Sequence, residues 1–264
     1  MDMEQPRHQT VTRYIAPLRE GGSLPALAEA DDGFKYVVKF RGAGHGTKAL
    51  VAELVGALVA KQLGLPVPEP VLLDVDERFG ITEPEQEIQD LLKGSRGLNM
   101  GLHFLSGALT LDPYANPVTP QMASDIVWLD AFITNVDRTA RNTNMLVWHG
   151  TEPWLIDHGA ALYFHHAWTG WEKTALTPFP YIRDHALLRK ASDLEGAHAR
   201  ALGLVTPEFI SDVTAMIPDS WLEWEGAPGT PDELRDVYRR FLTMRLENSE
   251  TFLRQAIDAR KSLI

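Results

Sequence analysis

Residues 135–159, NVDRTARNTNMLVWHGTEPWLIDHG, constrain the fold more than any other stretch of this sequence. Two short apolar runs, NMLVW and PWLID, are typical of paired strands joined by HGTE. Asp137 and Asn142 precede the first strand, and Asp157 ends the second. A solvated loop does not need the apolar runs, and a buried strand does not tolerate unpaired acids. The stretch therefore predicts a hairpin that brings three oxygen-bearing side chains to one place.

The spacing of these residues favours phosphoryl transfer. Asp137 and Asn142 form the pattern D-x-x-x-x-N, in which a kinase carboxylate orients the attacking hydroxyl and an amide oxygen holds a metal. Asp157 precedes His158 and Gly159, where kinases carry a second metal-binding acid. Two alternatives remain for these acids. Asp137 and Asn142 also suit an Asx-rich turn that caps a helix, and Asp157 suits a turn at a strand end.

Lys39 places a charge in the strand YVVKF, which otherwise favours burial. If Val37 faces the core, Lys39 shares that face, because side chains alternate along a strand. A buried ammonium needs an anionic partner. Glu53, on the following helix, is the candidate within the protein, and nucleotide phosphates are the other. The alternative is an edge strand from which Lys39 extends to solvent.

The order of the elements predicts an α+β fold with strands first and mostly helices afterwards. Strands are expected over 11–18 and 33–40, a helix over 47–63, an extended segment over 64–76, and one short helix within 80–101. Further helices are expected over 122–136, with Ser124 as N-cap, and from Thr206 and Thr230 onward, with a break near Asn248. We expect a flexible leader (1–10), a small β-rich N-terminal lobe (11–78) and a larger, mainly helical C-terminal lobe (79–264).

Composition excludes several classes of protein. The net charge is −11, and no run of Lys or Arg offers nucleic acid a basic face. The chain has no cysteine, so disulfides and thiolate metal sites are excluded. Its first residues lack the order of a signal peptide, and no apolar stretch approaches the length of a membrane span. We therefore expect a soluble, cytoplasmic protein that binds neither nucleic acid nor membrane.

From about Arg19 to about Ala191 the sequence resembles the HipA-like kinase family, a bacterial branch of the protein-kinase-like fold. The stretches that carry the resemblance are EGGSLP, YVVKFRGAGHGTKALVAELVGALVAKQLGLPVPEP, WLDAFITNVDRTARNTNML and WLIDHGAAL. Ordinary protein kinases have His where this chain has Asn135, and Phe where it has His158; both differences agree with the HipA-like branch. The resemblance implies a two-lobed, protein-kinase-like fold.

The resemblance also implies roles for individual residues. Lys39 is expected to bind the phosphates of ATP, with Glu53 as its partner, and Asp137 to act as the catalytic base. Asn142 and Asp157 are expected to hold Mg²⁺. A short phosphate-covering loop is expected at Gly21, Gly22 and Ser23, although this segment equally suits a plain turn. For Arg138 the candidates are a pair with Asp157, a contact with the γ-phosphate or a surface ion pair, and we favour a structural role.

The implied activity is ATP- and magnesium-dependent transfer to a Ser or Thr hydroxyl of a protein. One alternative keeps the fold but uses a small-molecule acceptor, an antibiotic or a metabolite. Another is a nucleotide-binding regulatory pseudokinase that acts by contact. By family analogy alone, an antitoxin-like protein is a further candidate partner.

Overall fold

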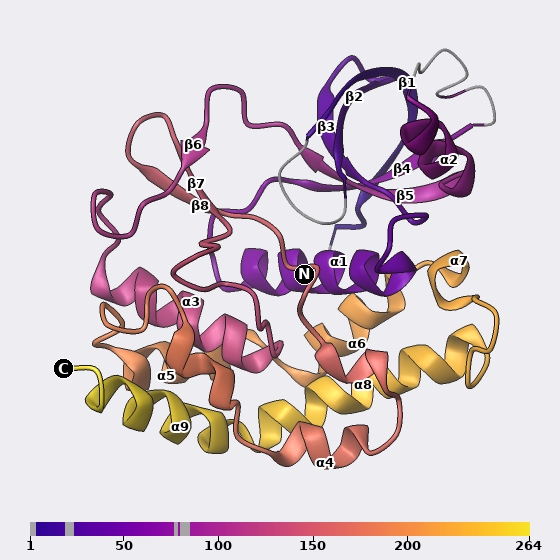
Figure 1. The fold of residues 1–264 in the computed structure, drawn as a ribbon. Coiled ribbons are helices and arrows are strands. Elements are labelled where there is room, and N and C mark those ends of the chain that lie inside the picture. Colours follow the sequence, from indigo (N-terminus) through magenta and orange to yellow (C-terminus); the bar gives the residue numbers. More distant parts are fainter. Residues whose placement is uncertain (1–3, 19–23, 77–78, 80–84) are drawn as a thin grey trace.

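The computed structural model describes residues 4–18, 24–76, 79 and 85–264 (Figure 1). The N-terminal part is a closed barrel whose strands lie in the order β1-β2-β3-β5-β4, with β1 and β4 parallel and the other neighbours antiparallel. The strands are β1 (Arg7–Pro17), β2 (Ala26–Ala30), β3 (Lys35–Lys39), β4 (Pro70–Val75) and β5 (Gly97–His103). The helix α2 (Gln86–Gly94) packs beside the barrel (Figure 1).

Strand β3 alternates between two environments. Tyr36 and Val38 are buried inside the barrel, whereas Val37 packs against the larger core outside it. Lys39 lies two positions beyond Val37 and shares its side of the strand. The strand therefore directs Lys39 away from the barrel interior and toward the rest of the molecule.

The helix α1 (Gly46–Gln62) lies between the barrel and the C-terminal helices (Figure 1). Every residue from Leu50 to Ala60 is buried. A helix covered on all sides needs apolar residues around its whole circumference, which explains why α1 has no polar face in this stretch. The exception is Glu53, a carboxylate with no exposed surface.

The C-terminal part packs helices beneath α1 and places a three-stranded sheet, in the order β6-β7-β8, beside the barrel (Figure 1). Its strands are β6 (Leu109–Thr110), β7 (Met145–Trp148) and β8 (Glu152–Leu155). Its helices include α3 (Pro120–Phe132), α4 (Trp171–Leu176), α5 (Leu194–Leu204), α6 (Pro207–Ala215), α7 (Asp219–Leu222), α8 (Pro231–Glu247) and α9 (Ser249–Lys261), with 3₁₀ turns η1 (Tyr163–His166) and η2 (Pro180–Asp184). In the described part of the chain no helix has the length and apolar character of a bilayer-spanning segment.

Two expectations about the N-terminal part are wrong. Residues 7–10 are not a flexible leader, because they begin β1 and pair in parallel with β4, from Arg7 opposite Val71 to Thr10 opposite Asp74. The expected lobe boundary at 78/79 separates β5 from its barrel, although β5 pairs with both β3 and β4. Its Gly101 packs so tightly on Leu73 that a Cβ would lie 2.5 Å from the leucine side chain. Barrel closure, a long-range effect, stabilises this glycine-containing strand.

The cap of α3 also differs from the expectation. Thr119, not Ser124, is the N-cap: its hydroxyl accepts a hydrogen bond from Met122 N, and Pro120 occupies the first turn. Ser124 lies inside the helix and donates to Pro120 O at 2.7 Å.

The expected caps of two later helices are confirmed. The Thr206 hydroxyl accepts from Phe209 N, and Thr230 forms a reciprocal capping box with Glu233. The expected break at Asn248 is confirmed as well, because this residue separates α8 from α9.

Candidate active site

Lys39 forms an ion pair with two carboxylates from distant parts of the chain. Its Nζ lies 2.6 Å from Glu53 Oε2 on α1 and 2.6 Å from Asp157 Oδ1, which follows β8. The side chains of Lys39 and Glu53 are 11% and 0% exposed, whereas that of Asp157 is 45% exposed. The Lys39–Glu53 pair expected from the sequence is therefore present, and extension of Lys39 into solvent is excluded.

The electrostatics of this cluster keep both buried groups charged. Burial lowers the pKa of Lys39, but Glu53 and Asp157 outweigh this effect and hold that pKa above its ordinary value. Burial likewise raises the pKa of Glu53, yet the Lys39 ammonium, together with the His158 ring, outweighs it and lowers the pKa to about 2. Lys39 and Glu53 therefore stay ionised at neutral pH, and the Lys39 ammonium lies beside the half-exposed Asp157 carboxylate.

The segment after Asp157 packs tightly on α1. Asp157 has a left-handed backbone with φ +56°, and His158, which is 1% exposed, turns toward the helix. A Cβ on Gly56 would lie 2.5 Å from the Cβ of His158, so only glycine fits at this position of α1. Gly56 was not among the residues predicted for the site, because its only signal in the sequence is a glycine inside a long apolar helix.

Asp137 lies in a loop between α3 and β7 and is held by amide side chains. Its Oδ2 accepts from Asn142 Nδ2 at 2.7 Å and from Asn144 Nδ2 at 3.2 Å. Its backbone N donates to Asn135 Oδ1 at 3.2 Å. The loop leads into the strand β7 and not into a helix. A helix-capping Asx turn is therefore excluded for these residues.

The base of the β7–β8 hairpin joins the Asp137 loop to Asp157. Asn144, whose side chain contacts Asp137, accepts a hydrogen bond from Ile156 N at its carbonyl, at 3.0 Å. Ile156 is the residue before Asp157. The hairpin predicted from the sequence is present. The hydrogen bond at its base joins Asn144, which contacts Asp137, to Ile156, which precedes Asp157.

Arg138 pairs with a carboxylate that the sequence analysis did not consider. Its Nε donates to Asp130 Oδ2 at 2.6 Å, and both side chains are fully buried. The predictions that Arg138 pairs with Asp157 or with a surface acid are therefore wrong. Its buried pair with Asp130 agrees with the structural role that we favoured. Burial raises the pKa of Asp130, but the Arg138 guanidinium outweighs it and holds that pKa well below its usual range.

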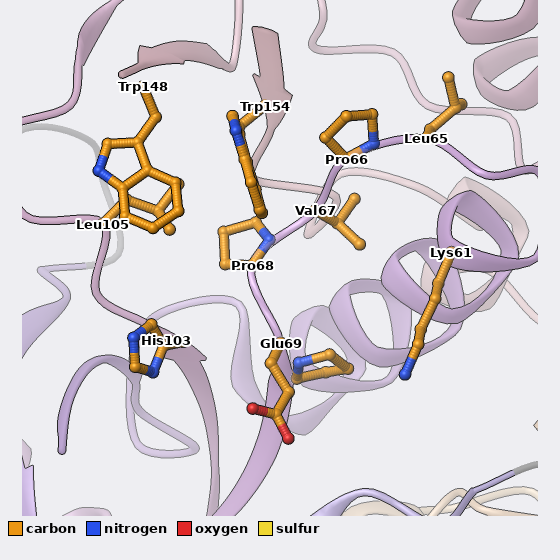
Figure 2. Close-up of a pocket in the computed structure, with 11 residues that line it drawn as sticks. Lys61, Leu65, Pro66, Val67, Pro68, Glu69, His103, Leu105, Trp148 and Trp154 are labelled. Carbon is orange, nitrogen blue, oxygen red and sulfur yellow. The ribbon is translucent and has the colours of Figure 1, made fainter. Parts of the chain in front are cut away.

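Gly21, Gly22 and Ser23 lie outside the described residues. A separate cavity of about 350 Å³ lies where the end of α1 and the link to β4 meet the β7–β8 hairpin (Figure 2). Its walls include Pro66, Pro68, Trp148 and Trp154, and none of the residues predicted for phosphoryl transfer lines it.

A family model described as HipA-like kinase matches residues 11–252. The chain belongs to the HipA-like kinase family. The match covers the barrel except the start of β1, and all but the end of the helical part, so the resemblance expected from the sequence is confirmed and the protein is a kinase.

Comparison with a solved structure shows that this HipA-like kinase has a kinase-like α+β fold. The Helicobacter pylori proinflammatory kinase CtkA is similar, with a TM-score of 0.60 and 13% identity over 98% of each chain. The Golgi casein kinase matches with a TM-score of 0.44 and 12% identity over 95% of this chain and 73% of its own. No curated protein matches the sequence.

Proposed function

We propose that this kinase transfers the γ-phosphoryl group of ATP, with Mg²⁺, to a Ser or Thr hydroxyl of a protein. The observation that carries the proposal is the position of Lys39 Nζ, 2.6 Å from each of two carboxylates, at the end of a barrel strand. In the proposed two-lobed arrangement the barrel is the N-terminal lobe and extends to His103, the last residue of β5. The helices and the hairpin form the C-terminal lobe.

The two partners of Lys39 differ in a way that suits nucleotide binding. Glu53 is fully buried and has no route to solvent, so it keeps the ammonium in place. Asp157 is 45% exposed, so its carboxylate is free to exchange Lys39 for a metal ion. Lys39 then keeps one anionic partner in the protein and directs its remaining N–H donors to phosphate oxygens.

The donor set fits magnesium bound with ATP. Mg²⁺ prefers oxygen ligands and binds through one or two protein groups together with phosphates and water. The Asp157 carboxylate and the Asn142 amide oxygen are such ligands, and Asn142 is exposed. When bound, ATP supplies the phosphoryl group and the metal neutralises charge on it.

The contacts of Asp137 suit a residue that orients the attacking hydroxyl. Among the described residues, Asn142 and Asn144 both donate to Oδ2 of Asp137. The carboxylate is therefore held in one orientation, and Oδ1 remains to accept the hydroxyl proton.

The surface around Asp137 favours a protein acceptor. Ala140, Arg141 and Asn142 are exposed, so a hydroxyl on another protein's surface reaches this loop without entering a cavity. The segment after Asp157 also presents Tyr163 and Tyr181, which are 58% and 61% exposed. Exposed rings of this kind offer contact area to a protein partner.

The proposal is tested by incubating the kinase with γ-labelled ATP and Mg²⁺, with and without a cell extract that has been separated by size. We expect label on protein from the high-mass fraction. Label confined to compounds in the low-mass fraction would instead support a small-molecule acceptor. No magnesium-dependent ATP binding by calorimetry, together with no transfer to either fraction, would indicate a pseudokinase.

A further inference from the structure

One buried carboxylate on α3 gathers three donors from around the predicted catalytic loop. Asp130 Oδ2 accepts from Arg138 Nε at 2.6 Å and from His185 Nε2 at 2.9 Å, and Oδ1 accepts from Asn135 Nδ2 at 2.9 Å. Asp130 has no exposed surface. Asn135 and Arg138 flank Asp137 in the sequence, so two of the three bonds hold the loop on either side of the predicted base.

Arg138 extends these contacts to the hairpin that ends in Asp157. Its Nη1 donates to the carbonyls of Asn144 and Ile156, the latter at 3.3 Å. These two residues are hydrogen-bonded to each other at the base of the hairpin, and Ile156 immediately precedes Asp157. A single planar guanidinium therefore spans from the Asp130 carboxylate to the base of the hairpin, and its rigid shape sets their separation.

His185 brings a third segment to the same carboxylate. Its Nδ1 accepts a hydrogen bond from Leu187 N at 3.1 Å, so the ring proton lies on Nε2 and is donated to Asp130. In addition, the Arg138 carbonyl accepts from Ala186 N at 3.0 Å. The segment that follows η2 is therefore attached both to Asp130 and to the backbone of the Asp137 loop.

We propose that Asp130 is a positioning residue for phosphoryl transfer. Through Arg138, Asn135 and His185 it sets the relative position of Asp137, Asp157 and the segment after η2. The inference rests on the proposed roles of Asp137 and Asp157. A buried ion pair adds little stability over an apolar replacement of the same shape, so its value here lies in the geometry that it specifies.

The same helix provides a matched control. Asp125, also on α3, accepts hydrogen bonds from Arg200 on α5, at 2.7 and 3.1 Å. Neither residue has a hydrogen bond to the Asp137 loop or the hairpin among the described residues. Asp125→Asn and Asp130→Asn therefore each remove the charge of an aspartate that pairs with arginine, but only Asp130→Asn acts on the site.

The test measures Mg-ATP hydrolysis, the stoichiometry of nucleotide binding and amide hydrogen exchange in both variants. For Asp130→Asn we expect kcat to fall about 100-fold while KM for ATP and the stoichiometry stay near the wild-type values, since misplacement by about 1 Å has this effect. The amides of Thr139, Ile156 and Ala186 should exchange about 10-fold faster or more, with no change in the barrel. Asp125→Asn should show none of these effects. Arg138→Lys should resemble Asp130→Asn, because one ammonium cannot replace the guanidinium fork.

Several results would overturn the inference. One is a kcat for Asp130→Asn equal to that of Asp125→Asn. Another is a stoichiometry that falls in proportion to kcat with faster exchange throughout the chain, which would indicate general instability. If the wild-type kinase neither binds nor hydrolyses Mg-ATP, the proposed function fails. The exchange data still decide, in that case, whether Asp130 holds these segments together.

Discussion

Lys39 Nζ lies 2.6 Å from the Asp157 carboxylate, although 118 positions separate the two residues in the chain. The contact joins the last residue of β3 in the barrel to the residue that follows the hairpin in the C-terminal part. Glu53, from the helix between these parts, binds the same ammonium at 2.6 Å. Three elements that are far apart in the sequence therefore meet at one charge, and the following predictions test what that charge and its neighbours do.

Removal of the Lys39 charge should affect stability and activity separately. Lys39→Met leaves the Glu53 carboxylate buried without a cation, which should lower the free energy of unfolding by about 3–5 kcal/mol and abolish transfer. The double variant Lys39→Met with Glu53→Gln should recover most of the stability, because no uncompensated charge remains, but none of the activity. Urea unfolding and transfer assays check both. Recovery of activity in the double variant would rule out a phosphate-binding role for Lys39.

Glu53 should also make stability dependent on acid pH. Lys39 and His158 outweigh the effect of burial and lower its pKa in the folded protein from 4.5 to about 2, so its contribution is fully present above pH 4.5 and is lost as the pH falls toward 2. The free energy of unfolding should therefore fall less steeply over this range in Glu53→Gln than in the wild type. Equal slopes in the two proteins would show that Glu53 is not ionised as the geometry requires.

Asp137→Asn should slow transfer strongly while nucleotide binding survives. Loss of a general base lowers the rate of the chemical step by about 100-fold or more, but the substituted residue is no ligand of the phosphates in our proposal. Intact-mass spectrometry and calorimetry measure the two properties. Asp258→Asn, an exposed acid on α9, is the control that should behave as wild type. Undiminished transfer in Asp137→Asn would remove this residue from the mechanism.

Asp157→Asn should weaken the magnesium-dependent part of ATP binding. The substitution removes the one charged metal ligand of the proposed site, while Glu53 continues to pair with Lys39. Calorimetric titrations of ATP with and without Mg²⁺ should show a large metal effect in the wild type and a small one in the variant. A metal effect of unchanged size would assign the metal to other residues.

Gly56→Ala should destabilise the kinase and lower its activity. The new methyl group would lie 2.5 Å from the Cβ of His158, so the segment that carries Asp157 must move. We expect a loss of about 1–3 kcal/mol by urea unfolding, as in other overpacked cores. Gly203→Ala, in α5, is the matched control: a Cβ there meets nothing within 4 Å, so helix propensity should make it neutral or about 0.5–1 kcal/mol more stable. Similar behaviour of the two variants would contradict the packing described for His158.

Local patterns in the sequence were sufficient to predict several parts of the site and of the fold. The alternation in YVVKF predicted the direction of Lys39 relative to Val37, and the apolar runs around HGTE predicted the hairpin that ends at Asp157. The capping residues Thr206 and Thr230 were likewise predicted from their position before Pro and an acid. Each of these features depends on residues within a few positions of one another, so periodicity and turn chemistry are enough to predict them.

Other parts depended on tertiary structure. The strand β2, with the sequence ALAEA, and the glycine-containing β5 have weak local preference for extended structure, and they form because neighbouring strands of the barrel pair with them. Asp130 stands among apolar residues of α3 and gives no local sign that Arg138 and His185 converge on it. The sequence by itself thus determined which side chains carry charge and which way short segments face. Only the packing of distant elements decided which charges meet, because a buried ion needs a partner and the fold alone brings that partner within reach.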